Sequence, residues 1–119
     1  MNCSDRIVDI RDSQKNIPVS TDDIIYIQVY KEYSIVTTRN HEIPCAIGLK
    51  SWEDTIRGTS ILRVHKLYLA NMKYIKSVRE DKIMMDHCEL PLGKGYEKQL
   101  KDRVQNYHYH RMRIALGWE

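Results

Sequence analysis

Hydrophobic positions recur with a period of about two over most of this chain, which is the pattern of half-buried β-strands. Residues 5–11 and 14–19 predict a hairpin, and Pro18 places its strand at a sheet edge because proline has no N–H to donate. β-Branched and aromatic residues fill 23–29, as is typical of a buried strand. Further strands are predicted at 33–39, 42–46, 61–65, 74–78, 82–86 and 88–92.

Two segments change to the spacing of three and four that is typical of an amphipathic helix. The first covers residues 49–56, where Ser51 with Asp54 is expected to support the start and Gly58 to stop the helix. The second starts near Glu97 and is predicted to run for about four turns. About eight to ten short strands with two helices indicate a predominantly β fold.

Length and cysteine usage limit the class of protein. A chain of 119 residues suits one domain, and we treat residues 1–119 as such. Its cysteines, Cys3, Cys45 and Cys88, form no metal-ligand or disulfide pattern, which favours a reducing cytoplasmic setting. No apolar run has the roughly 20 residues of a membrane span, and the start does not resemble a secretory signal, so no membrane partner is expected.

Charge is distributed unevenly along the chain. The formal net charge is +3, but residues 1–60 carry 7 basic and 9 acidic side chains, whereas residues 61–119 carry 12 and 7. A basic half is compatible with a polyanionic partner such as nucleic acid. Phenylalanine is absent while tyrosine occurs 8 times, and tyrosine is an aromatic residue that can also hydrogen-bond at an interface.

Residue types that support catalysis or metal binding do not come together in the sequence. His108 and His110 are two positions apart, so on a helix they point in different directions. The run 87–89 contains His, Cys and Glu but reads as the surface of a strand, and 93–95 lacks the spacing of a phosphate-binding loop. We therefore expect no enzyme activity, no metal and no cofactor.

Residues 63–75 mix basic, aromatic and amide side chains, and we interpret this segment, between the strand-like flanks predicted at 61–65 and 74–78, as a loop. Such a mixture suits a surface in which cations hold phosphates while His, Asn and Tyr meet base edges. A purely solvated loop would not ordinarily keep Leu67, Leu69 and Met72 among the charges.

This segment resembles the signature of the LytTR DNA-binding domain, Arg-x-His-Arg/Lys-Ser-x-x-Val-Asn. Residues 63–71 read Arg-Val-His-Lys-Leu-Tyr-Leu-Ala-Asn, with Leu67 and Ala70 as the departures. The run 23–27 is similar to the family's Asp-Ile-x-Tyr-Ile strand, and the short helix and 90–96 follow in the same order. The resemblance spans about residues 5–104, which leaves 105–119 as a C-terminal helical extension.

The resemblance implies a mainly β, LytTR-like fold of about ten short strands, with one helix in the middle and one at the C-terminus. It also implies that three loops, 30–34, 65–68 and 93–94, read successive major grooves of double-stranded DNA. The residues carried over as DNA-binding are Lys31, Tyr33, Ser34, His65, Lys66, Tyr68, Asn71 and Lys94.

Elementary chemistry gives several of these residues a choice of role. Lys66 and Lys94 can neutralise a phosphate or donate to guanine, whereas Lys31 is expected to serve phosphate alone. His65 either contacts DNA or holds the end of a strand, and Asn71 either holds the backbone of its loop or touches a base. Tyr33 and Ser34, in the first loop, are expected to bond phosphate or a base edge.

As a function, we predict sequence-specific DNA binding by the effector domain of a bacterial two-component response regulator. The family implies binding to direct repeats, a second copy of the chain as partner, and an N-terminal receiver domain elsewhere in a longer regulator. A stand-alone regulator is the other possibility for the whole protein. The alternative function is a LytTR-like module that binds or inhibits another protein and no longer binds DNA.

The C-terminal helix has three possible roles. It can cap the sheet, touch flanking phosphates or pair with a second protomer, and capping is our first expectation. Its apolar stripe consists of Leu100, Val104, Tyr107, Arg111 and Ile114.

Overall fold

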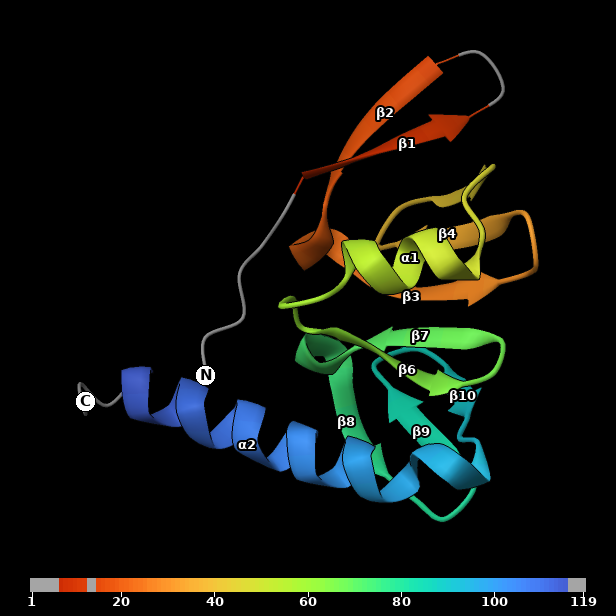
Figure 1. The fold of residues 1–119 in the computed structure, drawn as a ribbon. Helices are drawn as coiled ribbons and strands as arrows, with labels where there is room; N and C mark the ends of the chain where they lie inside the picture. Colours follow the sequence, from red (N-terminus) through yellow and green to blue (C-terminus); the bar gives the residue numbers. More distant parts are fainter. Residues whose placement is uncertain (1–6, 13–14, 116–119) are drawn as a thin grey trace.

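The computed structural model describes residues 7–12 and 15–115, with side chains described for 7–10 and 16–108. The predicted mainly β fold is confirmed, since the described residues form ten strands and two α-helices (Figure 1). The helices are α1 (Leu49–Thr55) and α2 (Glu97–Ala115). The strands are β1 (Ile7–Asp12), β2 (Lys15–Ser20), β3 (Ile24–Val29), β4 (Ser34–Thr38), β5 (Glu42–Cys45), β6 (Ile61–His65), β7 (Tyr68–Asn71), β8 (Ile75–Val78), β9 (Lys82–Met85) and β10 (Glu89–Pro91).

The strands form three antiparallel sheets, and the largest lies in the middle of the molecule. Its order is β5-β4-β3-β7-β6, while β10-β9-β8 form a second sheet and β1-β2 a hairpin. Because side chains alternate along a strand, the central sheet has an apolar surface on both faces. One face packs with α1 and the hairpin around Trp52, and the other packs with β8–β10 and α2 around Ile83 and Leu100.

The N-terminal hairpin agrees with its prediction. β1 pairs with β2 in antiparallel register, with Pro18 opposite Asp9. Each strand of a two-stranded sheet is an edge strand, so the expectation for Pro18 is confirmed. Ile10 and Val19 point into the core beside Ile43 of β5, which anchors the hairpin to the central sheet.

Helix α1 begins differently from the sequence-based expectation. Its N-cap is Gly48, without a side-chain capping bond, so the prediction that Ser51 and Asp54 support its start is wrong. A side chain at position 48 would collide with the backbone carbonyl of Lys31, and glycine allows this close approach. The predicted stop is confirmed, because Gly58 has a φ of 81°.

The interpretation of residues 63–75 as a loop is wrong. Residues 68–71 form β7, which lies between β3 and β6 inside the central sheet. Its middle residues, Leu69 and Ala70, are fully buried and belong to the cores on opposite faces. The polar and aromatic neighbours hide this two-residue apolar signal. Outside the strands, Lys66 and Leu67 form a turn and Met72–Tyr74 form a 3-10 helix.

Helix α2 is longer than predicted, since its 19 residues make about five turns. Leu100 is fully buried against the second core, and Val104 and Tyr107 pack beside it. This half of the helix therefore caps the domain. The side chains of Arg111 and Ile114, also predicted on the stripe, lie outside those the structure describes.

Candidate nucleic-acid interface

The three predicted loops lie at one edge of the molecule, toward the right of Figure 1. The first follows β3, the second is the turn between β6 and β7, and the third follows β10. Two backbone hydrogen bonds connect the end of β3, beside the first loop, and the third loop to the β6–β7 hairpin. The N–H of Val29 donates to the carbonyl of Leu67 at 2.8 Å, and the N–H of Gly93 donates to that of Val64 at 2.9 Å.

A β-bulge in β6 explains how the third loop attaches. Arg63 pairs with Leu69 and His65 pairs with Tyr68, so Val64 is an extra residue on its strand. A bulge disturbs the ladder locally, and here the carbonyl of Val64 accepts its bond from Gly93 instead. The sheet irregularity thereby sets the position of the third loop relative to the second.

Arg63 holds the backbone of the second turn through its guanidinium group. Its guanidinium donates to the carbonyl of Lys66 at 3.0 Å and, through Nε, to that of His65 at 3.3 Å. Nη1 also forms an ion pair with Glu53 of α1 at 2.9 Å, and the guanidinium lies 5.6 Å from the centre of the Tyr96 ring. Sequence reasoning gave Arg63 no role of its own. The available signal was its place at the start of the LytTR-like motif.

His65 holds the same turn through its ring. Nδ1 accepts a hydrogen bond from the N–H of Leu67 at 3.1 Å, which requires that this nitrogen carry no proton. In the neutral ring the proton then sits on Nε2, where it can donate to another group. The ring also meets Tyr68 edge-on, with centroids 5.9 Å apart. The holding role is therefore present, and a contact with DNA remains a proposal.

The first loop is a tight turn closed by aromatic stacking. The N–H of Tyr30 donates to the carbonyl of Tyr33 at 2.8 Å, and the two rings stack with centroids 4.4 Å apart. Tyr33 is 50% exposed, so half of the residue's surface is available to a partner. Lys31 and Glu32 form the exposed tip.

Ser34 is fully buried, and its predicted contact with DNA is corrected to a supporting role. Its hydroxyl accepts a 2.7 Å hydrogen bond from the indole N–H of Trp52 and lies 3.1 Å from the sulfur of Cys45. These contacts tie the start of β4 to α1 and β5. A side chain without exposed surface cannot reach phosphate or a base edge.

Asn71 is also fully buried, and its hydrogen bonds are those of the supporting role. Its Oδ1 accepts from the hydroxyl of Ser60 at 2.6 Å and from the N–H of Lys73 at 3.0 Å. Its Nδ2 donates to the carbonyls of Ile24 at 2.8 Å and Thr21 at 3.2 Å. The amide thus connects the end of β7 to the start of β3, far from the three loops.

The remaining predicted residues present charge and hydroxyl groups at the loop edge. Lys31, Lys66 and Lys94 are exposed, and none has an ion-pair partner among the described residues. Tyr68 is half-buried, and burial raises the pKa of its phenol, with smaller contributions from Tyr26 and Tyr30. Its hydroxyl therefore stays protonated at neutral pH and can donate.

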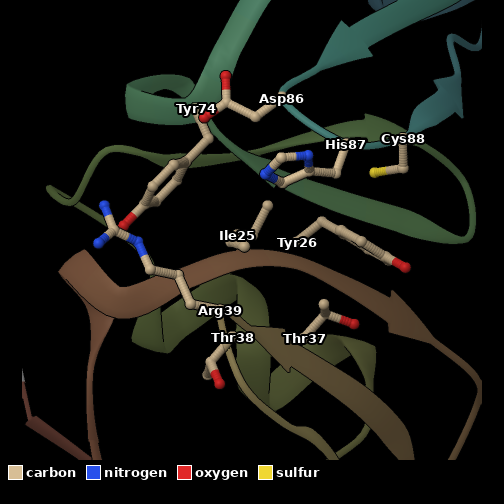
Figure 2. Close-up of a pocket in the computed structure, with 9 residues that line it drawn as sticks. All are labelled: Ile25, Tyr26, Thr37, Thr38, Arg39, Tyr74, Asp86, His87 and Cys88. Carbon is tan, nitrogen blue, oxygen red and sulfur yellow. The ribbon is translucent and has the colours of Figure 1, made fainter.

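A cleft of about 610 Å³ lies elsewhere, between the central sheet and β8–β10. Figure 2 shows Thr37, Thr38 and Arg39 along one wall and residues 86–88 along the other. Burial raises the pKa of Cys88, which keeps it as a thiol and not as the thiolate that nucleophilic chemistry needs. The described residues contain no group of three or more potential metal ligands. None of their helices is long and apolar enough to cross a membrane.

Comparison with known proteins agrees with this picture. Residues 14–105 match the model of the LytTr DNA-binding domain, and the chain therefore belongs to the LytTR family of DNA-binding domains. A LytTr DNA-binding domain of a putative methyl-accepting/DNA response regulator from Bacillus cereus has the same fold. Its TM-score is 0.70 at 18% identity, and the match covers 82% of this chain and 95% of that one.

Two curated relatives are named for sensory transduction and for transcription regulation. The Sensory transduction protein LytT of Bacillus subtilis is 29% identical over 89 residues, which is 70% of this chain and 37% of the relative. The Transcriptional regulatory protein LytR of Staphylococcus aureus is 24% identical over 105 residues, 76% of this chain and 43% of the relative. The chain thus spans less than half the length of either. Family membership supports a DNA-binding role in transcription regulation.

Proposed function

We propose that this domain binds double-stranded DNA in a sequence-specific manner through the three loops at one edge of the molecule. The observation that carries the proposal is the backbone connection of all three loops to one hairpin, β6–β7. Each loop has an exposed lysine without an ion-pair partner among the described residues. Cations held in fixed register can neutralise phosphates and direct neighbouring groups into a groove.

The candidate residues divide into a set at the loop edge, which consists of lysines and of aromatic residues with hydrogen-bonding groups, and a buried set. Lys31, Lys66 and Lys94 meet phosphate, and Lys66 and Lys94 also reach guanine O6 or N7. Tyr33, His65 and Tyr68 supply hydrogen-bonding groups beside these lysines. Ser34, being buried, supports the first loop, and Asn71, also buried, joins the end of β7 to the start of β3.

We further propose that the domain is the effector part of a longer cytoplasmic response regulator, with a receiver domain before it. The length of the two curated relatives, more than twice the matched segment, supports this arrangement. Binding by two copies to a direct repeat is part of the same proposal. Duplexes carrying one or two selected half-sites test it, because two copies bind the double site more tightly than the single site at equal protein concentration.

Fluorescence anisotropy tests DNA binding itself. A pool of random duplexes is selected with the wild-type domain, and the recovered site is measured at two salt concentrations with wild type, Lys66→Ala and Lys94→Ala. Each phosphate contact contributes about −0.9 to the slope of log affinity against log salt. A lysine that meets phosphate changes that slope by about 1 when removed, and one that meets guanine costs about 1–3 kcal/mol at one base pair.

Lys76→Ala is the matched control, because Lys76 is an exposed lysine on β8, outside the three loops. It should bind like wild type. Failure to select any preferred sequence, or equal losses for Lys76, Lys66 and Lys94, would refute the assigned interface. The alternative, a module for protein interaction, is favoured by the exposure of Tyr33 and Leu67, and it predicts no DNA affinity beyond weak, sequence-independent binding.

A further inference from the structure

Leu67 lies in the two-residue turn between β6 and β7 and has an exposed aliphatic side chain. Among the described residues, the large exposed hydrophobic side chains are Ile7, Tyr33 and Leu67, and Leu67 is 37% exposed. It belongs to neither hydrophobic core. Its exposure therefore has no packing explanation within the described part of the chain.

The backbone of Leu67 is held on both sides. Its N–H donates to Nδ1 of His65 at 3.1 Å, and its carbonyl accepts from the N–H of Val29 at 2.8 Å. Arg63 holds the carbonyl of the preceding residue, Lys66, at 3.0 Å. Because these bonds leave the turn little freedom, the side chain is presented at a set position beside a cation.

The chemistry of a DNA groove offers one partner for such a side chain. Phosphates and most base-edge groups are polar, and an aliphatic group gains nothing from them. The exception is the C5-methyl group of thymine, which lies in the major groove and takes apolar contacts. Lys66, next in sequence, provides the charge that brings this turn to the phosphate backbone.

We propose that Leu67 contacts the methyl group of a thymine and so makes the second loop specific for thymine at one position of the site. This inference rests on the proposed DNA-binding function and adds a residue to its specificity. Burial of one methyl-sized apolar group changes affinity by about fourfold, which is the effect expected for the contact.

Replacement of thymine by deoxyuridine tests the contact, because it removes the methyl group and leaves base pairing intact. In the site selected by the wild-type domain, each thymine is replaced in turn and affinity is measured by anisotropy. One replacement should weaken wild-type binding by about fourfold. The same replacement should have no effect on Leu67→Ala, whose affinity for the original site should already be reduced by a similar factor.

Two control variants separate this contact from general effects. Lys66→Ala and Ile7→Ala should keep the fourfold response to deoxyuridine, the first because Leu67 and not Lys66 contacts the methyl group and the second because Ile7 lies in the distant hairpin. Thermal unfolding of Leu67→Ala should match wild type, since the side chain is outside both cores.

Three results would overturn the inference: no thymine in the selected site responds, the response persists in Leu67→Ala, or the site contains no thymine. In each of these cases sequence-specific binding is still observed, so the proposed function stands while the role of Leu67 is lost. Absence of any selected site overturns both proposals together.

Discussion

Removal of the Asn71 side chain should unfold the domain more readily without removing a DNA contact. Asn71→Ala deletes four hydrogen bonds, to Ser60, Lys73, Ile24 and Thr21, all made by a fully buried amide. Each such bond contributes about 0.5–1.5 kcal/mol net, and partners left buried without water cost more. We expect a loss of about 3–4 kcal/mol, a large part of the 5–15 kcal/mol typical of a domain.

Urea denaturation followed by tryptophan fluorescence measures this loss, because Trp52 is fully buried in the first core. A thermal scan should show a midpoint lower by roughly 12–16 °C, at about 4 °C for each kcal/mol in a domain of this size. Asn40→Ala is the matched control, since Asn40 lies exposed between β4 and β5 and should change stability by less than about 0.5 kcal/mol.

DNA affinity decides between the two roles that the sequence left open for Asn71. At a temperature where the variant is folded, the DNA affinity of Asn71→Ala should stay within about twofold of wild type. A twofold change corresponds to about 0.4 kcal/mol of binding free energy. A stability loss under about 1 kcal/mol combined with a tenfold loss of affinity would refute the reasoning, because it would place the amide on DNA.

Three further predictions concern packing and ionisation. Gly48→Ala should cost about 1–3 kcal/mol in denaturation, because a Cβ there meets backbone of the first loop, whereas Gly95→Ala meets no atom within 4 Å and should be neutral. Ser34→Ala should cost about 1–3 kcal/mol and change the fluorescence of Trp52, whose indole N–H loses its acceptor. Alkylation of Cys88, read by peptide mass spectrometry, should need a higher pH in folded protein than in urea, because burial raises its pKa.

The same shift gives Cys88 a pH dependence of stability with a definite sign. A raised pKa in the folded state means that the neutral thiol favours folding below the ordinary thiol pKa, and that this contribution is lost as pH rises through the folded value. If the alkylation of Cys88 had the same pH dependence in folded and unfolded protein, the raised pKa would be contradicted. If Gly48→Ala and Gly95→Ala were equally stable, the predicted clash at position 48 would be contradicted. If Ser34→Ala had the stability and Trp52 fluorescence of wild type, the predicted role of its hydroxyl would be contradicted.

Most elements of the fold were readable from the sequence because the strands alternate apolar and polar residues. β3 was instead predicted from its β-branched and aromatic residues, whereas β4, β5, β9 and β10 all follow this pattern. β7 did not, since only Leu69 and Ala70 are apolar and buried while polar or aromatic residues flank them. A central strand that short is recognised by its pairing with β3 and β6, which is a non-local property.

The candidate site divides in the same way. Which residues carry charge or hydroxyl groups follows from the sequence, and the LytTR-like order of motifs located the three loops. Only the tertiary structure decided which of those residues face outward. Ser34 and Asn71 have the chemistry of a contact residue, but both are used inside the molecule. Ser34 bonds to Trp52 and Asn71 bonds to Ile24, each distant along the chain.

The sequence by itself therefore determined the β-rich class, the family and the place of the loops, because periodicity and motif order are local properties of the chain. The tertiary structure decided which candidate residues are exposed at the proposed interface. Burial and hydrogen-bond partners depend on segments as far apart as Val64 and Gly93, or Val29 and Leu67, that meet only after folding. Arg63 illustrates the difference, since its bonds to the second turn exist only once β6, α1 and that turn are assembled.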